Sequence, residues 1–132
     1  MRFIILLFQK KIDTKKFEKA LSLQKHRGPD HTGIKQINSH TIFGHVRLSI
    51  LDTSKASNQP FINKSTSNIL IFNGEIYNYL ELKRKLKKNT SFNTQGDTEV
   101  LLKLLEKEGV KSIQKLNGAY AFVFYDSNKK KL

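Results

Sequence analysis

Four short polar clusters carry the residue types from which a binding site can be built. They occupy residues 26–30 (HRGPD), Arg47 with its neighbours, residues 73–75 (NGE) and residues 96–97 (GD). A guanidinium such as that of Arg47 binds a carboxylate through two parallel hydrogen bonds. Asn73 and the Gly74 amide offer a pair of donors for an oxyanion, and Glu75 and Asp97 offer acceptors for an ammonium group. Together these groups predict a site for an α-amino acid with a reacting carbonyl.

Each cluster also has a purely structural interpretation. An arginine at the end of a strand can simply be exposed to solvent. Asn-Gly is a strong hairpin signal, and Asp97 is placed to cap a helix. Arg27, Pro29 and Asp30 are expected to fix a loop rather than to act on a substrate.

The residue types that are missing narrow the chemistry. These 132 residues contain no cysteine, so disulfides, thiolate chemistry and cysteine metal sites are excluded for them. The four histidines, at positions 26, 31, 40 and 45, have no metal-ligand spacing, and we expect no metal site. The predicted site therefore has binding groups but no evident nucleophile.

Apolar strands must position these clusters. Residues 69–72 (ILIF) predict a buried strand that turns or ends at Asn73 and Gly74, and residues 119–125 (AYAFVFY) predict a second buried strand. Further strands are expected at 2–8, 34–37 and 41–46, and the last of these places Arg47 directly at a strand end. Polar groups at the ends of rigid strands are a common way to mount a site.

Helices are expected between these strands. The first runs from about residue 14 to residue 24, with a cap at its start. Asn78 and Glu81 have the spacing of a capping box for a Lys-rich helix. Asp97 is expected to cap an amphipathic helix that Gly109 ends, and a short helix follows. The sequence thus predicts mixed α and β structure with no internal repeat.

The composition bounds the function classes. The net charge of +13 suggests nucleic-acid binding, but the basic residues are mostly Lys and are spread along the chain, whereas base readout favours Arg. We therefore expect no nucleic-acid partner. No apolar run reaches the ~20 residues of a membrane span, and residues 9–11 (QKK) interrupt the apolar start too early for a signal peptide. We expect one cytoplasmic domain over residues 1–132 and no membrane partner.

Six ordered motifs carry a family resemblance. They are HRGPD at 26–30, GHVRLSILD at 44–52, QP at 59–60, NGEIYNYLELK at 73–83, GDTEVLL at 96–102 and LNGAYAFVFYD at 116–126. In this order and spacing the chain resembles the glutaminase domain of glutamine-dependent asparagine synthetases, a class II glutamine amidotransferase. The resemblance implies an α+β fold, the αββα sandwich of the N-terminal-nucleophile hydrolases.

The resemblance also implies a role for each candidate residue. Glutamine is the expected ligand, with its carboxylate on Arg47. Asn73 and Gly74 form the oxyanion hole, and Glu75 and Asp97 lie around the α-amino group. The backbone of four further residues lines the same pocket: Leu48, Ser49, Ile50 and Leu51. Ammonia would pass to a synthetase domain or a separate synthetase chain, which belongs to the ligases and would use ATP and magnesium; no cofactor is expected within residues 1–132.

Two departures from the family pattern lead to a sharper hypothesis. The family nucleophile is a cysteine directly after the initiator Met, and this sequence has Arg2 there. The domain is also expected to be incomplete at its C-terminus, where residues 129–132 begin a returning strand, and the synthetase domain is absent. We expect a pseudoenzyme of asparagine biosynthesis that does not hydrolyse glutamine by itself. The alternatives are a non-catalytic glutamine-binding or synthetase-docking module, and a remnant of a split gene.

Overall fold

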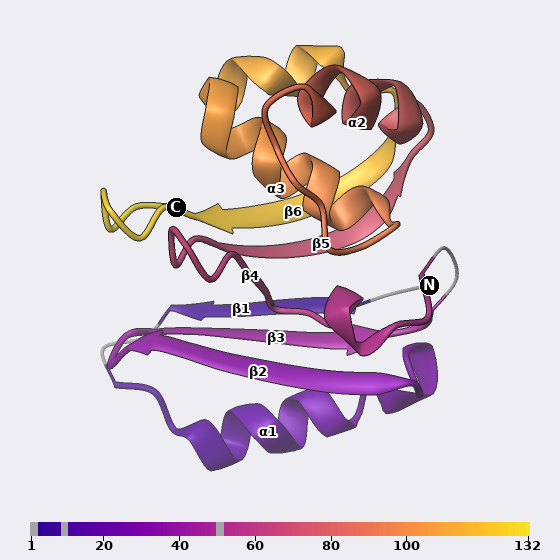
Figure 1. Ribbon diagram of the computed structural model, residues 1–132. Helices are drawn as coiled ribbons and strands as arrows, with labels where there is room; N and C mark the ends of the chain where they lie inside the picture. The colour runs from indigo at the N-terminus through magenta and orange to yellow at the C-terminus, as the bar shows by residue number, and fades with distance from the viewer. Residues whose placement is uncertain (1–2, 9–10, 50–51) are drawn as a thin grey trace.

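Two antiparallel sheets face each other in the middle of the molecule, and helices cover their outer faces (Figure 1). The computed structural model describes residues 3–8, 11–49 and 52–132. The first sheet has the order β1-β3-β2 and the second the order β4-β5-β6. The strands are β1 (Phe3–Phe8), β2 (His31–Asn38), β3 (Thr41–Arg47), β4 (Phe61–Ile62), β5 (Ile69–Ile76) and β6 (Gly118–Tyr125).

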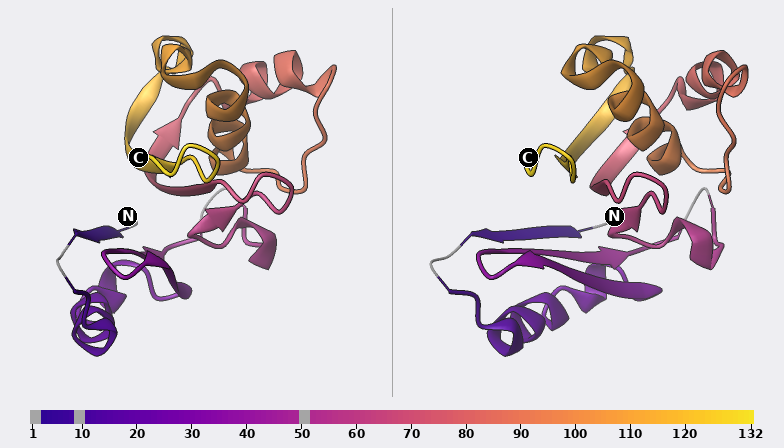
Figure 2. Two further views of the ribbon diagram at one scale, coloured as in Figure 1. Left: turned by 90° about the vertical axis from the view of Figure 1, so that its left-hand side faces the viewer. Right: turned by 60° about the vertical axis from the view of Figure 1, so that its left-hand side comes forward.

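The helices form the two outer layers, as the two views of Figure 2 show. Helix α1 lies against the first sheet, whereas α2, α3 and the 3-10 helix η3 lie on the second. The bounds are α1 (Thr14–Ser22), η1 (Lys25–Arg27), η2 (Lys55–Ser57), α2 (Tyr79–Lys87), α3 (Asp97–Glu108) and η3 (Gly109–Lys115). This order of layers confirms the predicted α+β fold and its αββα arrangement.

Alternation along the strands divides the core into three parts. In β3, Ile42 and Val46 pack with Phe17 and Leu21 of α1. Phe43 points the other way and packs with two residues of β5 between the sheets. Because side chains alternate between the faces of a strand, Arg47 lies on the same face as Phe43, toward the second sheet.

The third part of the core lies between the second sheet and its helices. Leu70, Phe72 and Ile76 of β5 pack there, while Ile69 and Ile71 face the first sheet. Apolar residues of α2 and α3 at helical spacing are buried in this cluster: Leu82, Leu86, Val100, Leu101, Leu104 and Leu105. β5 is therefore covered on both faces, which explains its continuous apolar run.

The expected cap at Asp97 is wrong, and Asn78 is the N-cap residue of α2 without the expected side-chain hydrogen bond. Asp97 is the first residue of α3, and Gly96 occupies the N-cap position. The Asn78 side chain makes no cap hydrogen bond; it donates to the carbonyl oxygen of Lys115 (2.9 Å) and accepts from the amide of Asn117 (3.0 Å). In both cases the side chain forms its hydrogen bonds with residues outside its own helix, instead of the cap hydrogen bond that the local sequence predicts. Asp13 does cap α1, accepting from the Lys16 amide.

Two strand predictions also need correction. β5 does not turn or end at Asn73 and Gly74, because it continues to Ile76 and pairs with β6 over its whole length. β6 forms as predicted but is only partly buried. Within the described residues β6 pairs with β5 alone, so one of its edges lies outside the core.

Candidate functional site

The polar ends of β3 and β5 lie at the same end of the two facing sheets (Figure 1). Nε2 of His45, two residues before Arg47, lies 3.2 Å from the carbonyl oxygen of Phe72, which precedes Asn73. Phe3, the first described residue of β1, pairs with Val46. The start of β1, the end of β3 and the middle of β5 therefore meet where the candidate residues gather.

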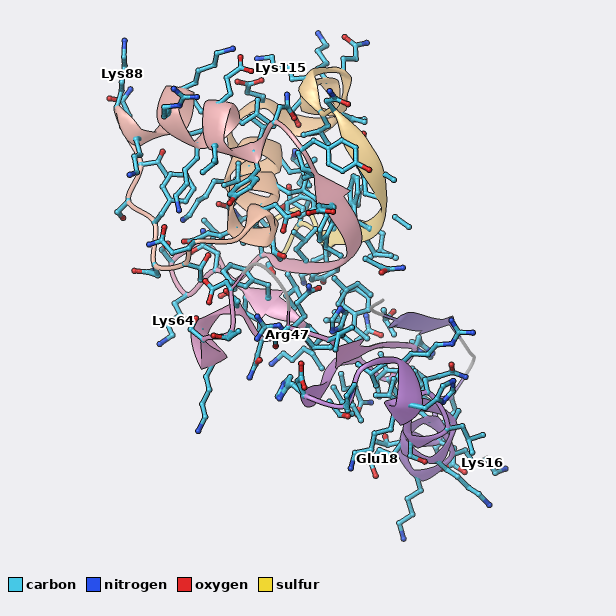
Figure 3. All side chains as sticks on the ribbon, turned by 90° about the vertical axis from the view of Figure 1, so that its right-hand side faces the viewer. Lys16, Glu18, Arg47, Lys64, Lys88 and Lys115 are labelled. Carbon is cyan, nitrogen blue, oxygen red and sulfur yellow. The ribbon has the colours of Figure 1, made fainter. Side chains whose placement is uncertain are left out.

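Arg47 is buried at the end of β3, with 2% of its surface exposed. One guanidinium nitrogen donates to the carbonyl oxygen of Ser54 (3.0 Å) and to Oδ1 of Asn58 (2.8 Å), and the other donates to the carbonyl oxygen of Asp52. Figure 3 shows Arg47 between the two halves of the sandwich. These neutral oxygen acceptors fix the orientation of the buried guanidinium without neutralising its positive charge.

A polar pocket of ≈ 460 Å³ opens beside this guanidinium. Its lining residues are Asp30, His31, Arg47, Ser49, Thr53, Lys55 and Asn58. Burial lowers the pKa of His31, and the positive charge of Arg47 lowers it further. The charge of Arg47 thus acts on the imidazole of His31 in the lining of this pocket.

The loop that carries the HRGPD motif packs against the backbone around Arg47 and holds it in place. Oδ2 of Asp30 accepts from the Ser49 amide (2.7 Å), and the Asp30 amide donates to the carbonyl oxygen of Arg47 (3.1 Å). A Cβ atom on Gly28 would lie 2.5 Å from the Arg47 nitrogen, so only glycine allows this approach. The motif therefore fixes the backbone on both sides of Arg47.

Asn73, Gly74 and Glu75 lie in β5 opposite β6, rather than in a hairpin turn. Asn73 and Gly74 are half-buried, and Glu75 is exposed. Gly74 has a φ of +142°, and a Cβ atom there would collide with the backbone of Ala119 and Tyr120. The positive φ gives the strand a local irregularity at the position that was expected to end it.

Gly74→Ala is expected to lower the free energy of unfolding by about 3 kcal/mol or more. It combines the strain of a positive φ with a collision against a backbone that cannot move aside. Urea unfolding followed by circular dichroism measures the effect. Gly109→Ala is the matched control, because Gly109 also has a positive φ (66°) but has nothing within 4 Å of the added Cβ. Equal losses in the two variants would contradict the collision at Gly74.

Asp97 connects the start of α3 to the end of β5. It is 1% exposed, and its Oδ2 accepts from the Ile76 amide (3.0 Å). A carboxylate at the first residue of a helix is stabilised by the helix dipole. Asp97 thus brings a negative charge to the end of β5, one residue beyond Glu75.

Asp52 lies between the Arg47 and Asp97 parts of the site. It ends the GHVRLSILD motif, but the sequence interpretation gave it no role in the site. Its Oδ1 accepts from the Ser54 amide (2.8 Å) and its Oδ2 from the Gln95 amide (2.8 Å). Burial raises the pKa of Asp52, but hydrogen bonds from the Ser54 side chain and from the Gln95 and Ser54 amides outweigh burial and hold this pKa well below its ordinary value. The local signal was the pair Asp52 and Ser54, which is typical of an Asx turn.

This depressed pKa predicts an acid-sensitive contribution to stability. The folded-state pKa of Asp52 lies below its unfolded value of about 4, so the stabilisation is fully present above the unfolded value and is lost progressively as the pH falls from there toward the lower folded-state pKa. Asp52→Asn is expected to cost about 1–2 kcal/mol at pH 7 and progressively less toward pH 3. Urea midpoints across this range measure it. Asp13→Asn, the same change at the exposed cap of α1, should leave the midpoint nearly unchanged; an equal loss there would contradict the assignment.

Gln59 belongs to the QP motif, but the sequence interpretation gave it no role in the site. It is 2% exposed, and its side-chain amide accepts from the Phe72 nitrogen (2.6 Å) and donates to the Phe72 oxygen (3.1 Å). The Gln59 side chain thus makes the two hydrogen bonds to the Phe72 backbone that a neighbouring strand would otherwise make. The residues next to Gln59 in the sequence do not indicate that its partner is Phe72, 13 residues away.

The remaining predicted residues fall in two groups. Leu48 and Ser49 follow β3 and are half-buried. Ile50, Leu51 and Arg2 lie outside the described residues. Within the part of the chain that the structure describes, no group of three or more His, Cys, Asp or Glu side chains could hold a metal ion, and no helix is long and apolar enough to cross a membrane.

Comparison with known proteins identifies the fold and the family of this chain. The chain shares its fold with the glutamine phosphoribosylpyrophosphate amidotransferase of Bacillus subtilis, with a TM-score of 0.78, 23% sequence identity and coverage of 96% of this chain and 35% of that one. This likeness shows the fold of the chain, the layered αββα arrangement described above. Residues 1–132 match the family described as glutamine amidotransferase domain, and the chain belongs to that family.

The sequence is similar to glutamine-hydrolysing asparagine synthetases, which confirms the resemblance predicted from the motifs. It is 40% identical to asparagine synthetase B of Escherichia coli over 85% of this chain and 20% of that protein. It is 42% identical to asparagine synthetase 1 of B. subtilis over 78% of this chain and 16% of that protein. The chain spans between 16% and 27% of the length of the curated relatives that it matches.

Proposed function

We propose that this chain binds L-glutamine where β3 and β5 meet. The glutamine carboxylate pairs with Arg47, its amino group lies near Glu75 and Asp97, and its side-chain carbonyl lies toward Asn73 and Gly74. The observation that carries the proposal is the buried guanidinium of Arg47, oriented by three oxygen acceptors beside a polar pocket. Membership of a glutamine amidotransferase family supports glutamine as the ligand.

The charges around the proposed site match the two charged groups of an amino acid. Arg47 supplies a cation at the end of β3, and Asp97 supplies a carboxylate at the start of α3. The contacts from Arg47 through Asp52 to Gln95 connect the end of β3 to the segment directly before α3. A ligand with a carboxylate and an ammonium group on the same carbon suits this arrangement. A ligand with only one of these charges would interact with either Arg47 or Asp97, but not with both.

The proposal includes a chemical limit: the 132-residue polypeptide binds glutamine without hydrolysing it. Hydrolysis through a covalent intermediate requires a nucleophile, and the family resemblance implies a cysteine where this sequence has Arg2. These residues contain no cysteine. What they supply is recognition of glutamine and donors for its carbonyl.

The proposed biological setting is asparagine synthesis, the process named in the relatives. ATP- and magnesium-dependent amidation of aspartate would belong to a synthetase domain or chain outside these 132 residues. The alternative role, docking on such a synthetase without binding glutamine, predicts the same setting. Glutamine binding by the chain alone separates the two roles.

A thermal-shift experiment tests the proposed ligand. L-Glutamine at 10 mM is expected to raise the melting temperature of the polypeptide, because a ligand that binds only the folded state stabilises it by mass action. D-Glutamine and L-asparagine are the matched controls; one inverts the amino and carboxylate positions, and the other shortens the side chain. Equal shifts with all three amino acids, or none with L-glutamine, would contradict the proposal.

A further inference from the structure

Asp52 contacts both halves of the proposed glutamine site through different atoms. Its carbonyl oxygen accepts from the Arg47 guanidinium. Its carboxylate oxygen Oδ2 accepts from the Gln95 amide (2.8 Å), two residues before Asp97. One residue thus touches the cation that binds the ligand carboxylate and the segment that carries the acidic residue near the ligand amino group.

The segment on the far side of this contact is held firmly at other points. Glu99, which is buried, accepts from the backbone amides of Asn93 (3.0 Å) and Thr94 (2.7 Å). Lys83 donates to the Thr94 carbonyl oxygen (2.7 Å). The Gln95 amide is therefore presented to Asp52 by a loop with little freedom, and the Gly96 Cα approaches closely enough that an added Cβ would lie 3.7 Å from the Asp52 Cβ.

We propose that Asp52 is a positioning residue that couples the carboxylate end of the glutamine site to its amino end. Asp52 sets the distance between Arg47 and Asp97 by holding the 52–58 loop against residues 95–97. A ligand that uses both ends needs this distance to be correct, whereas a ligand that uses only the carboxylate end does not. This inference rests on the proposed function, because it deepens the same site.

The two carboxylate oxygens of Asp52 allow this role to be isolated. Oδ1 forms a local Asx turn with the Ser54 amide (2.8 Å), which an asparagine side chain reproduces with its single oxygen. The contact with Gln95 needs the second oxygen, which Asn replaces by a donor NH₂ group facing another donor. Asp52→Asn therefore keeps the turn and removes the coupling. Asp52→Ser makes the same distinction, because a serine hydroxyl supports the turn without reaching Gln95.

The test compares two ligands on the 132-residue polypeptide by NMR titration. L-Glutamine uses both ends of the site, and glutaramic acid is glutamine without the α-amino group. Asp52→Asn and Asp52→Ser are expected to weaken L-glutamine binding by about tenfold or more, the value of one hydrogen bond to a charged group. Glutaramic acid should bind these variants as well as the wild type or slightly better, because a negative charge near Arg47 is removed. The spectra themselves report whether each variant is folded.

Each outcome bears on a different statement. If the wild type bound L-glutamine and a folded Asp52 variant bound it equally well, the inference about Asp52 would be overturned and the proposed function would stand. Equal weakening of both ligands would also overturn the coupling, because Asp52 would then act only on Arg47. If the wild type bound neither ligand, the proposed function would fall, and this inference with it. Asp13→Asn should leave both affinities unchanged.

Discussion

Arg47→Ala is expected to weaken L-glutamine binding by more than a hundredfold. The variant removes the cation that the proposal places on the ligand carboxylate, and loss of one member of a buried, hydrogen-bonded charge pair costs about 3 kcal/mol. It also releases the contacts from the guanidinium to the carbonyl oxygens of Asp52 and Ser54, so the 52–58 loop loses its anchor. Isothermal titration with L-glutamine measures the loss.

Two further variants separate the charge from the shape of the anchor. Arg47→Lys keeps a positive charge but lacks the planar fork, so we expect it to recover only part of the affinity. Arg84→Ala is the control. It removes an exposed arginine of α2, whose Nε donates to the Leu80 carbonyl oxygen, and it should leave the affinity for glutamine unchanged. A folded Arg47→Ala protein that binds glutamine within twofold of the wild type would refute the assignment of the carboxylate anchor.

Ammonia release from glutamine by the 132-residue polypeptide is expected to be at least about 10⁵-fold slower than by a glutamine-hydrolysing relative. Removal of the nucleophile from a hydrolase costs a factor on the order of a million, and oxyanion and binding groups account for the small activity that remains. A coupled glutamate dehydrogenase assay measures the rate, with asparagine synthetase B of E. coli as the active reference. A rate comparable to that of the reference would show that another group supplies the nucleophile.

Arg2→Cys tests the position assigned to the missing nucleophile. Removal of the initiator Met before Cys would provide a thiolate and a free terminal amine on one residue. Ammonia release is expected to rise clearly above the wild-type rate, and Arg2→Ser, which presents a weaker nucleophile at the same position, should give less. A folded Arg2→Cys protein with no gain would contradict the assignment of the nucleophile to position 2.

Periodicity predicted the strands and helices well because burial decides them. β3 and β5 follow their apolar runs, and Leu82 and Leu86 of α2 and the leucines of α3 face inward at helical spacing. The errors occur where a distant partner overrides a local signal. Asn73 and Gly74 have the sequence of a turn, but pairing with β6 keeps them in a strand. Asp97 precedes a helical pattern and was expected to cap it, but its carboxylate accepts a hydrogen bond from the Ile76 amide instead.

The sequence indicated the charged residues of the candidate site, but not the residues that hold its segments together. Arg47, Glu75 and Asp97 stand out because charged residues follow apolar strands or open a helix. Asp52 and Gln59 do not stand out, since their partners, Gln95 and Phe72, lie 43 and 13 residues away along the chain. Such contacts depend on how two loops meet in three dimensions, which local sequence does not encode.

Titration of the folded polypeptide with L-glutamine, with ammonia measured in the same sample, tests the central claim most directly. The account predicts saturable binding at one site per chain, with a dissociation constant in the range of about 1 μM to 1 mM in which enzymes hold their substrates. It also predicts that the glutamine remains intact at the end of the titration. A folded polypeptide that shows no saturable binding, or that converts glutamine to glutamate during the titration, would contradict it.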